Sequence, residues 1–212
     1  MSQIITNYNS HLKWWPECVK RFGTIRELPV INPHSLAINI IGKLSGPVLD
    51  FGCGIDKSHQ IDYNIPSDQY FCLDTDPEGQ FDYNSLGDIP KKQKFDFVIM
   101  NQVLEHFNFE NSMQLLNSIS GYINVGGYLF ITVPNNAHPV RFWSNVDHIT
   151  NWGFEDIYSL FKNIEFEVEE LARYNKYRLT LNPIKRLITN IVCEVFRVDW
   201  CDSIMGLGKK LK

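Results

Sequence analysis

The stretch VLDFGCGID, residues 48–56, decides the fold of this chain. Three apolar residues and one acid lead into Gly-Cys-Gly, which is the pattern of a buried strand that ends in a tight turn. Glycine at Gly52 and Gly54 lets the backbone turn sharply and approach a ligand without a Cβ in the way. The stretch therefore predicts a ligand-binding turn at the end of a strand.

The residues that follow this turn argue against a dinucleotide as the ligand. A dinucleotide-binding G-x-G-x-x-G turn opens directly into a helix whose N-terminus binds the pyrophosphate. Here Asp56 takes the place of the third glycine, and residues 57–66 predict only a weak helix. Asp50 and Asp56 also put negative charge where a pyrophosphate would sit. A cofactor that carries positive charge and no phosphates fits this turn better.

A second acid follows the next apolar run. Asp74 closes the run at 69–74, twenty residues after Gly54. In open α/β folds an acid at the end of the second strand hydrogen-bonds the ribose hydroxyls of the cofactor. Taken alone, Asp74 also fits a solvated loop, so its meaning depends on the rest of the pattern.

Seven strand-like apolar runs alternate with helical patterns along the chain. Near-continuous apolar strands separated by helices predict a parallel sheet that is covered on both faces, which is a doubly wound α/β fold. Ligands of such a fold bind at the carboxyl ends of the strands. The runs are 47–51, 69–74, 80–83, 95–101, 127–134, 165–174 and 202–208. The helical patterns are 34–44, 111–123, 154–163 and a long helix within 173–200, with Asn182 as its cap and Pro183 in its first turn.

The length of 212 residues suits a single domain with one sizeable core. We expect a helical N-terminal extension at 1–45, a cofactor-binding core at 46–172 and a helical cap packed on the domain at 173–200, before the last strand.

The composition excludes several classes of protein. The net charge is −4 without a stripe of Lys and Arg, which argues against nucleic acid as a partner. Five cysteines with no C-x-x-C pair argue against a disulfide framework or a zinc site, and favour reduced thiols in a cytoplasmic protein. The N-terminus lacks the pattern of a signal peptide, and no apolar run is long enough to span a bilayer.

The order of four segments is more specific than any one of them: VLDFGCG, then FCLDTDPE, then FDFVIMNQVLEHF, then YINVGGYLFITVPN. Over residues 46–170 this order resembles class I S-adenosylmethionine-dependent methyltransferases, especially the small-molecule and glycan group with V-L-E-H after the fourth strand. The resemblance implies a Rossmann-like, mostly parallel seven-stranded sheet with helices on both faces and an antiparallel last strand. It also implies S-adenosylmethionine as the cofactor and S-adenosylhomocysteine as its product.

The resemblance implies a role for each matching residue. The turn from Asp50 to Gly54 would lie beneath the methionine part of the cofactor, Asp74 would bind the ribose, and Asp82 would meet the adenine edge, with Asp88 as its rival for that role. The full set of implied cofactor contacts is Asp50, Gly52, Cys53, Gly54, Asp74, Thr75, Asp82, Tyr83, Asn101 and Gln102.

The chemistry of methyl transfer directs attention to histidine. The methyl group of a sulfonium is already activated, so the step requires in-line placement of the acceptor and no metal. A hydroxyl acceptor needs a general base, and histidine is suited to this near neutral pH. His148 is the first candidate, with Asp147 to orient it or to act as base itself, and His106 is the second. Each histidine also fits a purely structural role in its loop.

The acceptor is predicted from the loop at 135–148, NNAHPVRFWSNVDH, which is long, polar and aromatic. Asn135, Arg141 and Trp143 are its candidate contacts, and this composition favours a sugar or glycan hydroxyl. A quinone or phenolic small molecule is the alternative acceptor. Alternatives of another class are a nicotinamide-dependent oxidoreductase and a cofactor-binding module without catalysis.

Overall fold

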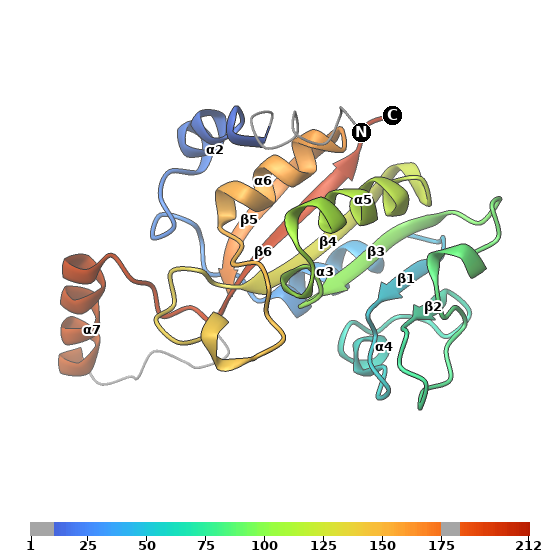
Figure 1. Ribbon diagram of the computed structural model, residues 1–212, viewed down its shortest axis with the longest axis horizontal. Coiled ribbons are helices and arrows are strands. Elements are labelled where there is room, and N and C mark those ends of the chain that lie inside the picture. The colour runs from blue at the N-terminus through green and yellow to red at the C-terminus, as the bar shows by residue number, and fades with distance from the viewer. Residues whose placement is uncertain (1–10, 175–182) are drawn as a thin grey trace.

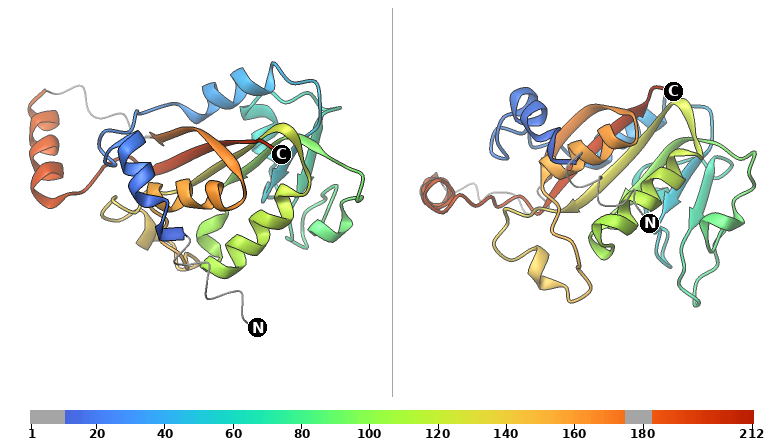
Figure 2. Two further views of the ribbon diagram at one scale, coloured as in Figure 1. Left: turned by 90° about the horizontal axis from the view of Figure 1, so that it is seen from above. Right: turned by 45° about the horizontal axis from the view of Figure 1, so that its top comes forward.

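A computed structural model describes residues 11–174 and 183–212 (Figure 1). Its centre is one six-stranded sheet in the order β2-β1-β3-β4-β6-β5. The view from above shows α3 on one face of the sheet and α2, α5 and α6 on the other (Figure 2). The strands are β1 (Val48–Phe51), β2 (Tyr70–Leu73), β3 (Phe95–Asn101), β4 (Ile123–Pro134), β5 (Phe166–Tyr174) and β6 (Ser203–Lys210).

The sheet confirms the predicted fold class but has one strand fewer than predicted. Strands β1 to β4 are parallel, and β6 runs antiparallel to both β4 and β5. The last strand is therefore antiparallel, as expected. The predicted strand at 80–83 is wrong, because only Tyr83 pairs there, in an isolated bridge with Leu73. The acids and glycine around it favour a loop over a ladder.

The helices begin where the sequence supplies caps. The Asn32 side chain accepts a hydrogen bond from the His34 amide at the start of α3, and Asn108 does the same for Asn111 at the start of α5. The helix predicted at 154–163 is confirmed with the same bounds. The α-helices are α2 (Trp15–Phe22), α3 (Pro33–Ile41), α4 (Ser58–Asp62), α5 (Phe109–Ser120), α6 (Phe154–Asn163) and α7 (Pro183–Phe196); three short 3-10 turns are η1 (Leu86–Asp88), η2 (Leu104–His106) and η3 (Phe142–Ser144).

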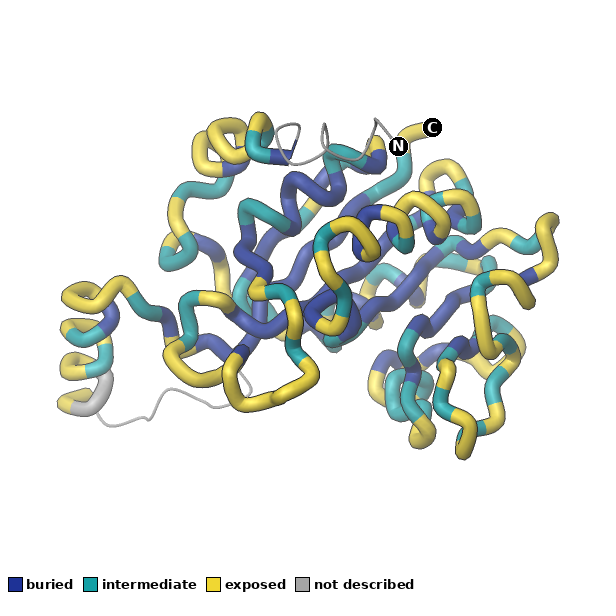
Figure 3. Tube along the Cα trace, in the orientation of Figure 1, coloured by how far each residue is buried: buried dark blue, intermediate teal, exposed yellow. Residues whose placement is uncertain are grey.

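The central strands are covered on both faces. Phe97 and Ile99 of β3 pack with Ala37 and Ile41 of α3 on one face, whereas Val98 packs in the cluster on the other face. Burying alternate residues on both faces explains why this strand reads as an unbroken apolar run. In Figure 3 the central strands are largely dark blue, the colour of buried residues. The strand ends at the carboxyl edge are thereby held in fixed positions.

The late segment differs from the prediction of a long helix packed on the domain. Arg173 lies in strand β5 (Phe166–Tyr174) instead, and α7 covers only Pro183–Phe196, while Asn182 lies outside the described residues. The helix stands beside the sheet in Figure 1, and its Leu187 and Ile191 are exposed. The faces of the sheet are already covered by other helices, so α7 packs mainly through Cys193.

The cysteines and the lengths of the helices also bear on the predictions from the sequence. All five cysteines are unpaired and buried, so the prediction of no disulfide framework is confirmed. Among the described helices, none is both long enough and apolar enough to cross a membrane.

Candidate functional site

The glycine turn after β1 has the geometry that only glycine tolerates well. Gly52 has a φ of +72° and Gly54 a φ of +66°, both in the left-handed region. A Cβ on Gly52 would also lie 2.7 Å from Cγ2 of Val103. The backbone therefore approaches η2 closely at this point. Asp56, by contrast, is exposed.

Asp74 is fixed beside this turn by backbone amides. Its Oδ2 accepts a hydrogen bond from the Gly54 amide at 2.8 Å, and its Oδ1 accepts from the Thr75 and Asp76 amides at 2.7 and 3.1 Å. Charge-assisted bonds of this kind hold a carboxylate in one orientation. The acid at the end of β2 and the turn at the end of β1 are therefore one structural unit.

A cavity of about 310 Å³ opens at this unit. Its volume lies at the small end of the range of ligand sites. It unites five residues that the sequence predicted for the site, namely Gly52, Asp74, Thr75, Gln102 and His106. Its other lining residues are Phe51, Leu73, Val103 and Phe107.

The lining of this cavity fits S-adenosylmethionine. The glycine cradle gives the ligand close access to the backbone, Asp74 supplies hydrogen-bond acceptors for hydroxyls, and the apolar side chains suit the flat adenosine group. Lysine and arginine are absent from the residues that line it, which suits a cationic ligand without phosphates.

Asp50 supports the turn from below instead of facing the ligand. Its side chain is fully buried, and its carboxylate accepts a hydrogen bond from the Tyr70 hydroxyl at 2.8 Å. The same carboxylate lies 3.0 Å from Nδ1 of His59. The predicted place of Asp50 beneath the methionine part of the cofactor stays a prediction. Cys53 is likewise buried, at 3% exposure.

The two acids predicted near adenine both hold the loop after β2. Asp82 accepts a hydrogen bond from the Cys72 amide at 2.8 Å, and the Tyr83 ring stacks on Phe71 with 6.3 Å between centroids. Asp88 accepts hydrogen bonds from the Asn84 amide and the Ser85 hydroxyl. None of these residues lines the 310 Å³ cavity, although Tyr83 is bridged to Leu73, which does.

Gln102 lies between this cavity and a second one. Its φ of +56° is uncommon for a residue other than glycine, and such strained backbone gathers at functional sites. The strain is held by a 3.0 Å hydrogen bond from the Gln102 amide to the carbonyl of Thr132. The Gln102 side chain donates to the hydroxyls of Thr132 and Ser203 at 3.2 and 3.5 Å.

The second cavity has a volume of about 390 Å³, and polar and apolar atoms share its surface about equally. Every lining residue except Pro33 carries a polar group. These groups come from α3, α4 and the adjoining ends of four strands, and the loop after β4 adds Arg141. The polar lining residues are His34, Ser58, His59, Asp62, Tyr63, Asn101, Gln102, Thr132, Arg141, Tyr174 and Ser203.

His59 was not singled out from the sequence, because it lies in the weak helix at 57–66. Its Nε2 is 2.8 Å from Nδ2 of Asn101, and Oδ1 of Asn101 accepts a hydrogen bond from the Thr132 hydroxyl. Burial opposes the charged form of His59, but the hydrogen bond to Asp50 and the Asp50 charge outweigh it and raise the pKa of His59 above its usual value. His59 thus links Asp50, at the end of β1, to Asn101, which lines the polar cavity.

Backbone hydrogen bonds bring His148 to the turn after β3. The carbonyl of Glu105 in η2 accepts from the Ile149 and Thr150 amides at 2.7 and 3.1 Å. The Trp152 indole donates to the Leu104 carbonyl at 3.0 Å. The loop after β4 is thereby attached to η2, and the rings of His106 and His148 lie with their centroids 5.3 Å apart. The two histidines predicted from the sequence are neighbours.

Each of these rings is oriented by a backbone carbonyl. His148 uses Nδ1 toward the Phe142 carbonyl at 2.8 Å, and His106 uses Nδ1 toward the Asp147 carbonyl at 3.2 Å. The Phe142 carbonyl thus contacts His148, and Asp147 contacts His106 through its backbone carbonyl, while the predicted role of Asp147 in orienting His148 or acting as the base stays a prediction.

Glu105 lies next to this pair and was missed in the sequence. Its side chain is fully buried, and neither carboxylate oxygen has a hydrogen-bond partner among the described residues. Burial raises the pKa of Glu105 to about 7, against smaller opposing effects of its own backbone N–H, which is not placed for a hydrogen bond, and of the Arg141 charge. In the sequence, only its position in the segment V-L-E-H draws attention to Glu105.

The three predicted acceptor residues fall in different environments. Asn135 is fully buried and donates to the Asp199 carboxylate and the Cys201 carbonyl at 2.7 and 2.9 Å, so its amide serves the fold and not a ligand. Arg141 lines the polar cavity. Trp143 lies in η3 of the same loop and is 76% exposed.

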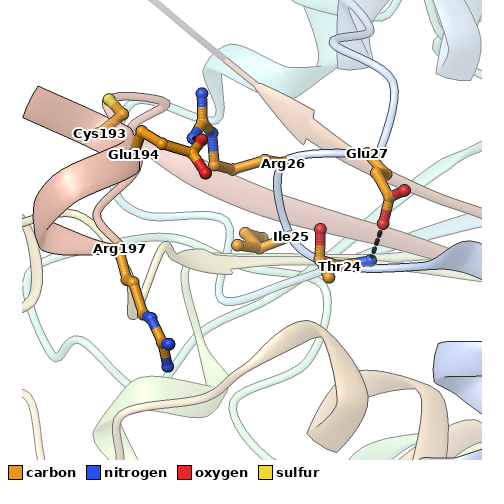
Figure 4. Close-up of a pocket in the computed structure, with 7 residues that line it drawn as sticks. All are labelled: Thr24, Ile25, Arg26, Glu27, Cys193, Glu194 and Arg197. Carbon is orange, nitrogen blue, oxygen red and sulfur yellow. Dashed lines mark hydrogen bonds and ion pairs between the residues drawn. The ribbon is translucent and has the colours of Figure 1, made fainter. Parts of the chain in front are cut away.

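A further cavity of about 670 Å³ lies apart from these residues (Figure 4). It is bounded by Thr24, Ile25 and Glu27 on one side and by Arg197 after α7 on the other. An ion pair between Arg26 and Glu194 crosses it. This cavity lies between α7 and the segment after α2, and none of its lining residues belongs to the glycine turn.

Comparisons with known proteins agree with this geometry. Residues 33–171 match the protein family described as a methyltransferase domain. A SAM-dependent methyltransferase from Archaeoglobus fulgidus superposes with a TM-score of 0.61 at 16% identity, covering 93% of this chain and 100% of that one. The methyltransferase partner of the Trm112 activator from Haloferax volcanii gives 0.61 at 14% identity, covering 98% and 97%.

An S-adenosylmethionine-dependent methyltransferase from Mesorhizobium loti superposes with a TM-score of 0.56 at 10% identity, covering 84% of this chain and 98% of that one. A search of curated protein sequences finds no match. At these identities the solved structures support the fold, whereas the family match spans well over half of the sequence. The chain belongs to the methyltransferase domain family.

Proposed function

We propose that this enzyme transfers the methyl group of S-adenosylmethionine to a hydroxyl group of a sugar or glycan. The observation that carries the proposal is the polar cavity of about 390 Å³, which meets the cofactor cavity at Gln102. Hydroxyls, imidazoles, amides and a guanidinium surround it, and these groups match the many hydroxyls of a carbohydrate. A phenol or quinone offers fewer groups that can form hydrogen bonds with this lining than a carbohydrate does.

The cofactor is proposed to lie along the carboxyl edge of β1, β2 and β3. Asp74, with Thr75 beside it, binds the ribose hydroxyls, and the turn at Gly52 and Gly54 accommodates the methionine part. Gln102 then lies on the side of the sulfonium that faces the polar cavity. Asp82 and Tyr83 stay our candidates for the adenine edge.

The reaction is a single displacement at carbon. A lone pair of the acceptor oxygen forms the new C–O bond while the C–S bond breaks, and its electron pair stays on sulfur as the neutral thioether of S-adenosylhomocysteine. The hydroxyl proton leaves through the pair His106 and His148, whose rings are held by carbonyls at the mouth of the site, and passes to water. The protein contributes by placing the oxygen in line with the S–CH₃ bond and by excluding water.

The test is methyl transfer from methyl-labelled S-adenosylmethionine to a panel of monosaccharides, nucleotide sugars, glycans and phenols. Label in carbohydrates, with one S-adenosylhomocysteine released per methyl group transferred, is the expected result. Label in phenols alone would contradict the proposal.

Two variants separate acceptor binding from cofactor binding. Tyr174→Phe and Ser203→Ala each remove one hydroxyl from the wall of the polar cavity. We expect each to raise KM for the sugar by roughly tenfold, the value of one or two hydrogen bonds, while the affinity for S-adenosylhomocysteine stays unchanged. An unchanged KM in both variants would place the acceptor elsewhere.

A further inference from the structure

We propose that Glu105, His106 and His148 form a binding site for a divalent transition-metal ion. One ligand atom from each of the three side chains lies within 4.8 Å of the others. Two ligands of one ion with metal–nitrogen distances of 2.0–2.1 Å are at most about 4.2 Å apart. A small rotation of the side chains therefore brings all three onto one ion.

The buried carboxylate is the observation that points to a ligand. Glu105 has 0% exposure, and both of its oxygens lack a hydrogen-bond partner among the described residues. Buried charges are normally paired or coordinate a metal, because an isolated one is strongly unfavourable. Arg141 acts on Glu105 only through its charge and is itself exposed. A bound cation would satisfy the carboxylate.

The two histidines are oriented as metal ligands usually are. Each ring has Nδ1 toward a backbone carbonyl, that of Phe142 for His148 and that of Asp147 for His106. A second hydrogen bond of this kind fixes the tautomer and directs the other nitrogen toward an ion. Nε2 is then the nitrogen that is left to bind. The sequence led us to expect no metal, because no C-x-x-C pair occurs and methyl transfer from a sulfonium requires none.

The set of donors identifies the class of ion. Two imidazoles and one carboxylate suit Zn²⁺, Fe²⁺ or Mn²⁺, whereas Mg²⁺ prefers oxygen donors. Three protein ligands leave coordination positions open, as in catalytic sites and unlike closed structural zinc sites. The open positions can take water or an oxygen of a second ligand.

A role for the ion rests on the proposed function. His106 also lines the cofactor cavity, so the ion would sit beside the methyl donor. An acceptor hydroxyl bound to the ion loses its proton to water near neutral pH, because the metal lowers the pKa of a bound oxygen acid. The resulting alkoxide then attacks the methyl carbon. In the metal-bound enzyme the two histidines would hold the ion, and water, not either imidazole, would take the proton.

The experiment measures metal binding by the full chain without cofactor or acceptor. The protein is stripped with a chelator, and Zn²⁺, Mn²⁺ and Co²⁺ are titrated calorimetrically, with the visible spectrum of Co²⁺ as a second readout. We expect one ion per chain and a Co²⁺ spectrum typical of nitrogen and oxygen ligands. Absence of binding by all three ions would overturn the proposal.

Matched variants assign the site. Glu105→Gln and His148→Gln should weaken binding at least tenfold and change the Co²⁺ spectrum, whereas Glu110→Gln and His34→Gln, which lie outside the cluster, should not. Thermal unfolding without metal shows that each variant is folded, and only the wild type and the two controls should be stabilised when metal is added. Equal binding by Glu105→Gln and wild type would overturn the assignment.

The two proposals fail separately. If the ion binds but no carbohydrate is labelled, the proposed function is wrong and the metal site stands. If carbohydrates are labelled equally by the chelated enzyme and no ion binds, the metal site is wrong and the histidines act directly as bases.

Discussion

Asp74 accepts a hydrogen bond from the backbone amide of Gly54, with 2.8 Å between Oδ2 and the nitrogen. This contact joins the acid at the end of β2 to the turn at the end of β1, and both face the same cavity edge. We expect Asp74→Ala to weaken S-adenosylhomocysteine binding by roughly 10- to 100-fold, the value of hydrogen bonds to a charged group. Calorimetric titration measures this, and Asp68→Asn, an exposed acid before β2, is the control. Equal affinities of Asp74→Ala and wild type would show that the ribose site lies elsewhere.

Gly52 is expected to resist substitution for two separable reasons. Gly52→Ala introduces a left-handed alanine and a Cβ at 2.7 Å from Val103. We predict a loss of about 2–4 kcal/mol in the free energy of unfolding, measured in urea. Gly126→Ala separates the backbone strain from the steric clash, because Gly126 has a φ of +82° but no atom lies within 4 Å of the new Cβ. The free energy of unfolding of this variant should fall by only about 1–2 kcal/mol. Equal losses in the two variants would contradict the close approach.

The burial of Glu105 predicts a pH-dependent stability. Its pKa is raised from 4.5 to about 7, so its ionisation favours the unfolded chain as the pH rises through this range. Without metal, Glu105→Gln should gain stability relative to wild type by about 3 kcal/mol between pH 4.5 and pH 8, and no more above that. Urea unfolding with a chelator present, at several pH values, measures the difference. A constant difference across the range would contradict a buried, unpaired carboxylate.

His59 predicts the opposite slope. Its pKa is raised above 6.5 although burial opposes its charge, because Asp50 accepts its hydrogen bond. The stabilisation by His59 is therefore complete below pH 6.5 and lost as the pH rises through the raised pKa. The difference in unfolding free energy between wild type and His59→Gln should shrink over that window. In the Asp50→Asn background this loss with rising pH should disappear, because burial then opposes the charged form of His59 without the Asp50 charge. With Asp50 present, a difference that grows with pH would contradict the pairing.

Patterns of apolar residues predict most of the fold. Strand β3 and helix α6 have the predicted bounds, because an unbroken apolar run and an amphipathic repeat each report burial directly. The run at 80–83 fails because a strand also needs a partner along its length, and only Tyr83 has one. Helix α7 has the expected apolar repeat, yet it lies largely exposed, since a repeat does not say which surface remains to be covered.

The candidate site is predicted only where its residues are close in sequence to a strand end. Gly52, Asp74 and Gln102 follow strands, so the fold class places them at one edge. The approach of His148 to Glu105 depends on hydrogen bonds between loop backbones, which side-chain patterns do not encode. Asn135 reads as a polar loop residue, but it is buried because it bonds to Asp199 and Cys201, far along the chain.

The central claim is that the turn at Gly52 and Gly54, with Asp74, binds S-adenosylmethionine and not a dinucleotide. Calorimetric titration of the full chain with S-adenosylhomocysteine, and separately with NAD⁺ and NADH, tests it most directly. The account predicts one S-adenosylhomocysteine bound per chain and no binding of either nicotinamide cofactor. Binding of NAD⁺ or NADH without binding of S-adenosylhomocysteine would contradict it.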